Sequence, residues 1–207
     1  MPVIISKKSS FELAPAGTHY ATCIGVYDIG TQETTFGPKP KIVLMFELTD
    51  TPMGDGRPFT VRGIYNVSLG KNKSGKMGPL RELLEGWRGK PFTDKELEGF
   101  DIGKLCGVAA LLNVVHEASG EATYANIKSA SPLLKGMARL KPSNPILMYS
   151  IPDDGENFPA GMPDWIVDKV KGSLEWAAKN SVPDEVDEEP NVLANEAAET
   201  VSGEIPF

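Results

Sequence analysis

The side chains that could carry out acid–base, nucleophilic or metal chemistry are few in this sequence. It contains two histidines, His19 and His116, and two cysteines, Cys23 and Cys106. His19 and Cys23 lie on one predicted strand with their Cα atoms roughly 13 Å apart, too far to share one zinc ion. The spacings C-x-x-C, H-E-x-x-H and G-x-x-x-x-G-K-[ST] are all absent. We therefore expect no metal site, no cofactor and no nucleotide hydrolysis, and we interpret these four residues as structural.

A nuclease or hydrolase would need carboxylates that converge on one point. The candidates are Asp28, Glu47 and Asp55, and their positions in the sequence show no clustered acid–base pattern. We therefore expect the protein not to be an enzyme. Magnesium-dependent loss of nucleic-acid strands would reveal this class of function.

The charge of the chain is divided unevenly. The formal net charge is −7, but residues 183–207 contain eight Asp or Glu and no Lys or Arg. Subtracting them leaves 21 basic and 28 − 8 = 20 acidic side chains, so residues 1–182 are close to +1. Six basic residues and no acid lie between Arg57 and Arg81. A near-neutral body with a basic strip and a separate acidic segment indicates a polyanionic partner.

Length and composition are typical of one globular domain with an extension. Of 207 residues, 41% are hydrophobic and 24% charged, and the 21 Gly and 17 Pro favour short strands joined by turns. The apolar runs are too short to cross a bilayer, and the first residues lack the order of charges found in a secretory signal. Two cysteines do not make a disulfide framework. We expect a cytoplasmic protein with no membrane partner.

Three strands are predicted in the first third of the chain. Residues 18–30, 41–49 and 59–69 are rich in β-formers, and the last two alternate apolar with polar side chains. This period of two predicts an antiparallel meander with one core face and one polar, partly basic face. Five aromatic residues are expected in the core rather than at a binding site. Four of them lie on these strands, Tyr27, Phe46, Phe59 and Tyr65, and the fifth is Trp87, further along the chain.

Helices are predicted next. Residues 78–89 have apolar side chains at helical spacing after Pro79. Residues 92–100 add a helical turn that begins with a capping box, Thr93 and Glu96.

The second half of the chain predicts a hairpin, an irregular region and one more helix. The hairpin combines residues 104–116 with 122–130, residues 131–161 hold five prolines, and residues 163–179 are amphipathic through Ile166, Val170, Leu174 and Ala177. Three strands, a helical insert and two strands follow the order of an OB-fold, a five-stranded Greek-key barrel. We therefore predict a mainly β domain over residues 1–180 with a C-terminal helix, followed by a disordered acidic tail over 181–207.

Such barrels bind single strands across strands 2 and 3 and beside the connecting loops. The first connecting loop offers Phe36 for base stacking and Lys39 for phosphate contact. The predicted DNA-binding residues, in chain order, are Phe36, Lys39, Lys41, Arg62, Lys71, Lys73, Lys76, Tyr124 and Lys128.

The sequence contains the motifs "YDIGTQ", "FEL", "SLGKNKSG", "LRELLEGWRGKPFTDKELEGFD" and "YANIKS". Together they resemble a family of tailed-phage single-stranded DNA-binding proteins with an OB core, and the resemblance covers about residues 16–176. Its most specific part is the block from Trp87 to Thr93. The resemblance implies an accessory protein of replication or recombination, which for a phage protein would act in the host cytoplasm.

The acidic segment ends in Gly203-Glu204-Ile205-Pro206-Phe207. It resembles the interaction tip of bacterial and phage single-strand binders, an acidic run closed by Asp-Asp-x-Pro-Phe, although one of the two acids is missing. The resemblance implies that Glu204, Ile205, Pro206 and Phe207 bind a replication or recombination partner.

The sequence therefore predicts a protein that binds single-stranded DNA without sequence preference and recruits partners through this tip. The alternative is an OB-like adaptor whose polar face and tail bind proteins instead of DNA. A homo-oligomer is compatible with either reading.

Overall fold

The structure is a computed structural model, and it describes residues 12–72, 74–120 and 122–180. Lys73 and the predicted acidic tail with its tip, Glu204–Phe207, lie outside the described residues.

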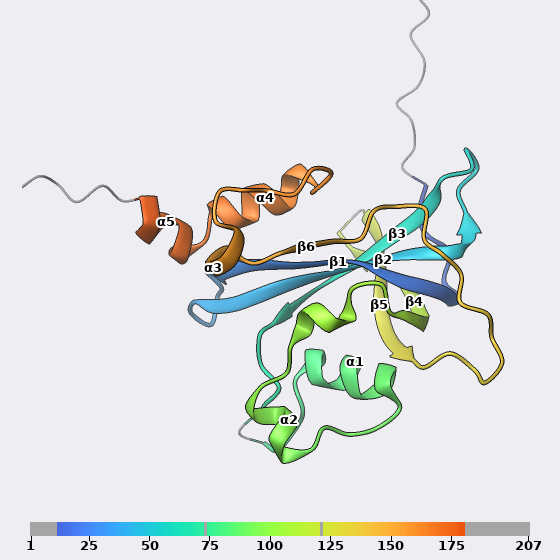
Figure 1. Ribbon diagram of the computed structural model, residues 1–207, viewed down its shortest axis with the longest axis horizontal. Coiled ribbons are helices and arrows are strands. Elements are labelled where there is room, and N and C mark those ends of the chain that lie inside the picture. Colours follow the sequence, from blue (N-terminus) through green and yellow to red (C-terminus); the bar gives the residue numbers. More distant parts are fainter. Residues whose placement is uncertain (1–11, 73, 121, 181–207) are drawn as a thin grey trace, which may run out of the picture.

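A curved, mainly antiparallel sheet forms the centre of the described part (Figure 1). Its main strands are β1 (Gly17–Gln32), β2 (Lys39–Pro52), β3 (Pro58–Asn66), β4 (Ala109–Ser119) and β5 (Ala122–Ser131), in the order β3-β2-β1-β4-β5. A short β6 (Leu147–Tyr149) pairs in parallel with the middle of β1. Because this order ends at β3 and β5, each of these strands has one edge that pairs with no other described strand. The prediction of a mainly β fold with five strands in this chain order is confirmed.

Helices lie on both sides of the sheet (Figure 1). One side carries α1 (Pro79–Arg88), α2 (Asp94–Glu98) and the 3-10 helix η1 (Ile102–Leu105), all inserted between β3 and β4. The other side carries α3 (Ile151–Asp154), α4 (Asp164–Lys171) and α5 (Leu174–Asn180). The predicted insert is confirmed, including the capping box in which Thr93 and Glu96 bond to each other's backbone N–H.

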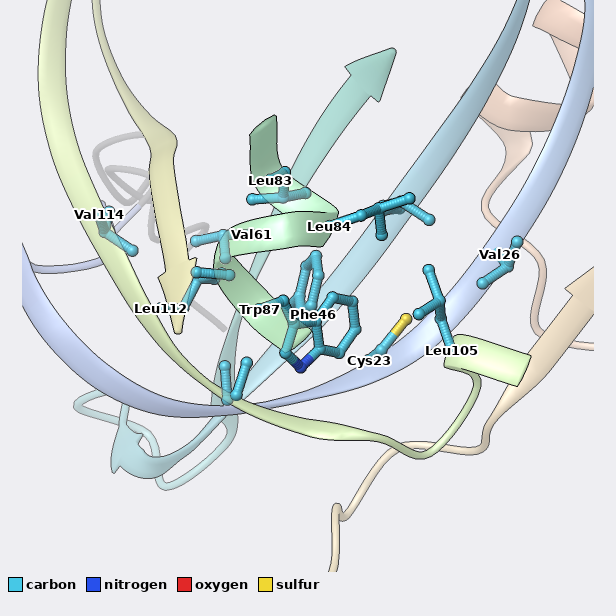
Figure 2. Close-up of a cluster of buried hydrophobic side chains, with 14 of the residues drawn as sticks. Cys23, Val26, Phe46, Val61, Leu83, Leu84, Trp87, Leu105, Leu112 and Val114 are labelled. Carbon is cyan, nitrogen blue, oxygen red and sulfur yellow. The ribbon is translucent and has the colours of Figure 1, made fainter. Parts of the chain in front are cut away.

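The main hydrophobic core lies between the concave face of the sheet and α1. Figure 2 shows Leu83, Leu84 and Trp87 of α1 pointing toward Phe46 and Leu112 of the strands. The Trp87 ring lies 5.2 Å from the Phe46 ring, and its Nε1 donates a hydrogen bond to the Ala109 carbonyl at 2.9 Å. Gly89 caps the C-terminus of α1, and its φ of 67° lies in the left-handed region. Since Trp87 fills the centre of this core, it has a structural role, as expected.

A second core on the convex face of β1 and β2 corrects the sequence-based expectation for that face. Val43 of β2 is fully buried there with Tyr149 of β6 and with Ile166 and Val170 of α4. The second face of β2 was expected to be polar and accessible, and this is wrong. The alternation of β2 is real, but both of its faces are covered.

Three smaller differences concern element boundaries. The strand expected at 104–116 begins only at Ala109, because Lys104 and Leu105 belong to η1 and Gly107 adopts a positive φ of 77°. The irregular region 131–161 contains β6 and α3. The single helix expected over 163–179 is broken between α4 and α5, so Leu174 is exposed instead of lying on the buried stripe.

Candidate nucleic-acid interface

A groove follows the gap between the unpaired edges of β3 and β5. Its walls are residues 57–65 at β3 and 123–128 of β5, and residues 12–14 lie at one end. It has a volume of about 1330 Å³, which is above the roughly 300–1,000 Å³ typical of small-molecule clefts. We call it the β3–β5 groove.

Three predicted DNA-binding residues line the β3–β5 groove: Arg62 from β3, and Tyr124 and Lys128 from β5. Tyr124 is 50% exposed, so one part of its ring is free to stack on a ligand. The Arg62 guanidinium lies 4.3 Å from the centroid of the Trp165 ring of α4. This cation–π contact restrains Arg62 at the rim of the groove while leaving the residue exposed.

The groove itself is balanced in charge. Its cations are Arg57, Arg62 and Lys128, and its acids are Glu12, Asp55 and Glu117.

The three acids already have partners. The Arg57 side chain contacts Asp55 at 2.6 Å, and hydrogen bonds from Arg57 lower the pKa of the Asp55 carboxyl. Glu117 accepts a hydrogen bond from Asn126 Nδ2 at 2.6 Å, and Glu12 accepts one from the Gly54 N–H at 2.9 Å. The groove alone therefore has no net positive charge.

The loop between β1 and β2 presents an aromatic ring with a cation beside it. Phe36 is 85% exposed, and Lys39 Nζ lies 5.8 Å from the centre of its ring. The Thr34 hydroxyl accepts from the Phe36 N–H at 3.2 Å and donates to the Gly37 carbonyl at 2.6 Å. These bonds order the loop, so Phe36 is held in the solvent by local structure.

The loop between β3 and α1 presents Lys71 and Lys76, both exposed. Asn72 organises it, because its Oδ1 accepts hydrogen bonds from the Ser74 N–H at 3.0 Å and the Lys76 N–H at 2.9 Å. Arg81, at the end of the basic strip, bonds instead to Glu85 at 2.8 Å and to the Leu69 carbonyl at 3.1 Å. Arg81 therefore stabilises the start of this loop through these contacts.

The two basic loops meet at the end of β3. Lys41 stands opposite Asn66 in the β2–β3 ladder, and the Val67 N–H donates to the Pro40 carbonyl at 2.9 Å. The β1–β2 loop, the β3–α1 loop and the β3–β5 groove therefore share β3 as their common element. The described predicted residues therefore lie at one end of the β2–β3 pair and along the β3–β5 groove, and they are not gathered on one flat face.

The histidines and cysteines have structural surroundings. His19 Nδ1 lies 3.0 Å from Thr51 Oγ1, and His116 Nε2 donates to the Ala14 carbonyl at 2.8 Å. Cys23 is buried, which raises the pKa of its thiol, and no disulfide joins it to Cys106. In the described ranges no three His, Cys, Asp or Glu side chains are grouped so that they could hold a metal ion.

Each of the three carboxylates considered for hydrolysis has its own separate hydrogen-bond partners. Asp28 accepts a hydrogen bond from the Gly30 N–H at 2.9 Å, and Asp55 is paired with Arg57. Glu47 is fully buried and bonds to the backbone at Ser143 and Asn144. Each carboxylate thus orders its own local turn or loop.

Two residues at the groove were missed by sequence reasoning. Trp165 holds Arg62, and Ile64 is 45% exposed on β3 at the groove wall. The sequence did indicate a contact for Trp165, since this residue lies next to Ile166 but outside the predicted apolar stripe of the helix. An aromatic residue off the buried stripe of a helix often contacts a second element.

No family model and no curated protein sequence matches this chain. None of the helices that the structure describes combines the length and apolarity needed to cross a membrane.

Proposed function

We propose that the protein is an OB-fold protein that binds single-stranded DNA without sequence preference. The observation that carries the proposal is the meeting of Arg62, Tyr124 and Lys128 in one groove, although they come from two strands far apart in sequence. An aromatic ring with cations along a groove is the arrangement by which proteins stack bases and contact phosphates without reading their identity.

The strand arrangement supports the barrel part of the proposal. An OB-fold is a partly open five-stranded Greek-key barrel. The order β3-β2-β1-β4-β5, with β3 and β5 approaching each other and a helix between β3 and β4, agrees with that description.

The path proposed for DNA follows the free edge of β3. The convex face of β2 is covered by α4 and β6, so a strand crossing it would have to displace a buried core. The groove, by contrast, leads along β3 toward the end where Lys41, Lys71 and Lys76 lie. Phe36 then provides a second stacking position beyond the groove, next to Lys39.

Recruitment of replication or recombination partners is the second part of the proposal. It is supported by the sequence of the segment 183–207, with eight acids and the tip Glu204-Ile205-Pro206-Phe207. The acids keep the segment solvated, and the apolar tip offers two large side chains to a partner.

Fluorescence titration with oligo-dT and with duplex of equal length, each at two salt concentrations, tests the proposal. We expect tighter binding of the single strand, and a steep decrease in affinity with salt because phosphate neutralisation releases counterions. Equal affinity for both nucleic acids contradicts the proposal.

The adaptor alternative has its own supporting observation. The unpaired edges of β3 and β5 could accept an extended peptide as an added strand. Peptide binding of this kind depends weakly on salt, so the same titration series separates the two functions.

A further inference from the structure

A second surface combines exposed apolar side chains with unpaired cations, and its loop borders the β3–β5 groove at Asn144. It is formed by the loop 132–146, by β6 and by the residues that precede β4. Six large apolar residues on it are each at least 39% exposed: Val108, Leu134, Met137, Leu140, Ile146 and Met148. Scattered exposed apolar residues are ordinary, but a group of this size on one loop and its neighbours marks an interaction surface. We call it the loop surface.

Three of these apolar residues, Val108, Met137 and Ile146, lie close together. Ile146 lies over Gly107, since a Cβ at that glycine would come 3.2 Å from Ile146 Cδ1, and Val108 follows directly. Val108 and Met137 in turn line a hollow of about 420 Å³ over Trp87 and Leu105. This hollow is large enough for an aromatic or branched aliphatic side chain.

The loop surface is positively charged. Residues 131–152 contain Lys135, Arg139 and Lys141 and no acid. Arg139 lines the hollow, and none of the three forms an ion pair with any described residue. Two copies of this surface facing each other would bring like charges together, so an acidic ligand with apolar side chains fits better than a symmetric dimer.

Hydrogen bonds to β1 and β2 fix the backbone of the loop, so the loop surface has a defined structure. The Tyr20 hydroxyl accepts a hydrogen bond from the Leu140 N–H at 2.8 Å, and the Glu47 carboxylate accepts bonds from Ser143 and Asn144. The apolar side chains therefore stay exposed although their backbone is tied to the sheet. A ligand here would meet a preformed surface and order little of the chain.

From these observations we infer that the acidic segment 183–207 of the same chain docks on the loop surface. Its Ile205 and Phe207 occupy the hollow and the apolar residues beside it, and Glu204 lies near Arg139. The 27 residues after Asn180 (207 − 180) extend to about 90 Å, whereas a folded body of this size has a radius of gyration of about 16 Å. The segment can therefore reach the surface within one molecule. Docking there would withhold the tip from partners while leaving the β3–β5 groove accessible.

Hydrogen exchange on the full-length protein tests this inference independently of DNA binding. The comparison is between the wild type and I205S/F207S, which keeps every charge of the acidic segment. We expect amide exchange over residues 133–140 to be about fivefold slower in the wild type, as for a surface that is docked most of the time. Equal exchange in the two proteins overturns the inference, and protection over 123–128 instead would place the segment in the groove.

A charge-reversal variant provides a second test of docking. K135E/R139E should remove the protection of residues 133–140, whereas the control K95E on α2 should keep it. Loss of protection in both variants, or in neither, contradicts docking through the cations of the loop. Raising the protein concentration about tenfold should leave the protection unchanged, because docking within one molecule is independent of concentration. Protection that increases with concentration would show that a second copy is the occupant.

Discussion

Glu47 of β2 and Asn144, 97 positions further along the chain, are joined by two hydrogen bonds of 2.8 Å, from the backbone N–H and from Nδ2 of Asn144. The Ser143 N–H donates to the same carboxylate at 2.8 Å. Glu47 is fully buried, so its charge is balanced by these N–H donors and not by water. This contact fixes the loop 132–146 against the convex face of the sheet.

Glu47→Gln should destabilise the protein strongly. The new amide N–H₂ would face N–H donors, leaving one or two buried groups unpaired at about 1–3 kcal/mol each. We expect the free energy of unfolding in urea to decrease by about 2 kcal/mol or more. Glu33→Gln, on the exposed β1–β2 loop, is the matched control and should change it by less than about 0.5 kcal/mol. A similar small change for both variants would show that the Glu47 contact contributes little.

The sequence predicted the strands and the first helix well because each has a local signal. Alternation identifies β2 and β3, and helical spacing after Pro79 identifies α1. The Thr93–Glu96 capping box needs only four consecutive residues, so it too could be predicted.

The second core could not be predicted in the same way. Val43 is buried by Tyr149 and Ile166, residues more than 100 positions away, and nothing near Val43 indicates this. Likewise, Glu47 appeared polar and accessible because its partners lie in a proline-rich loop without periodicity. The candidate site follows the same rule. Phe36 and Lys39 are local neighbours and were predicted together, whereas the contact of Arg62 with Trp165 depends on how α4 packs.

The contribution of Glu96 to the stability of α2 should decrease as the pH falls into the acid range. The Thr93 N–H donates to its carboxylate, and the Thr93 hydroxyl and the Arg88 guanidinium add to this, so its pKa falls from 4.5 to about 2. Because the folded-state pKa is below the unfolded value, the contribution is complete above 4.5 and is lost as the pH falls toward 2. Wild type should therefore exceed Glu96→Gln in urea midpoint at neutral pH, and this difference should shrink below pH 4.5. A difference that stays constant with pH would contradict the role of the Glu96 charge.

Replacing Lys71, Lys73 and Lys76 together by alanine should weaken single-strand binding equally for all sequences. Each phosphate contact on single strands contributes about 0.7 to the slope of log affinity against log salt, so the slope should decrease by up to about 2. Titration with oligo-dT at several salt concentrations measures it. Lys95→Ala on α2 is the control and should keep the wild-type slope. A triple variant with the wild-type slope would mean that the β3–α1 loop is only a solvated turn.

Tyr124→Ala should lower the affinity for single strands by removing a stacking surface. One base stacked on an aromatic ring is worth about 1–3 kcal/mol, or roughly 5- to 150-fold in affinity. Tyr124→Phe keeps the ring and should remain within about twofold of the wild type. Tyr124 is half exposed, so neither change should alter the urea midpoint much. If alanine and phenylalanine have the same effect, the ring does not stack on a base.

Removing residues 183–207 should strengthen binding to single strands or leave it unchanged. The deletion takes away eight carboxylates and changes the formal net charge from −7 to +1, since 21 basic and 20 acidic residues remain. The remaining protein repels phosphates less. The effect should be largest at low salt, where screening is weaker and charges interact over longer distances. I205S/F207S, which keeps the charge, should bind DNA like the wild type but lose recruitment of partners in a pull-down from lysate. Because the two variants separate charge from apolar contact, a deletion that abolishes DNA binding would place the acidic segment within the binding site and contradict this division of roles.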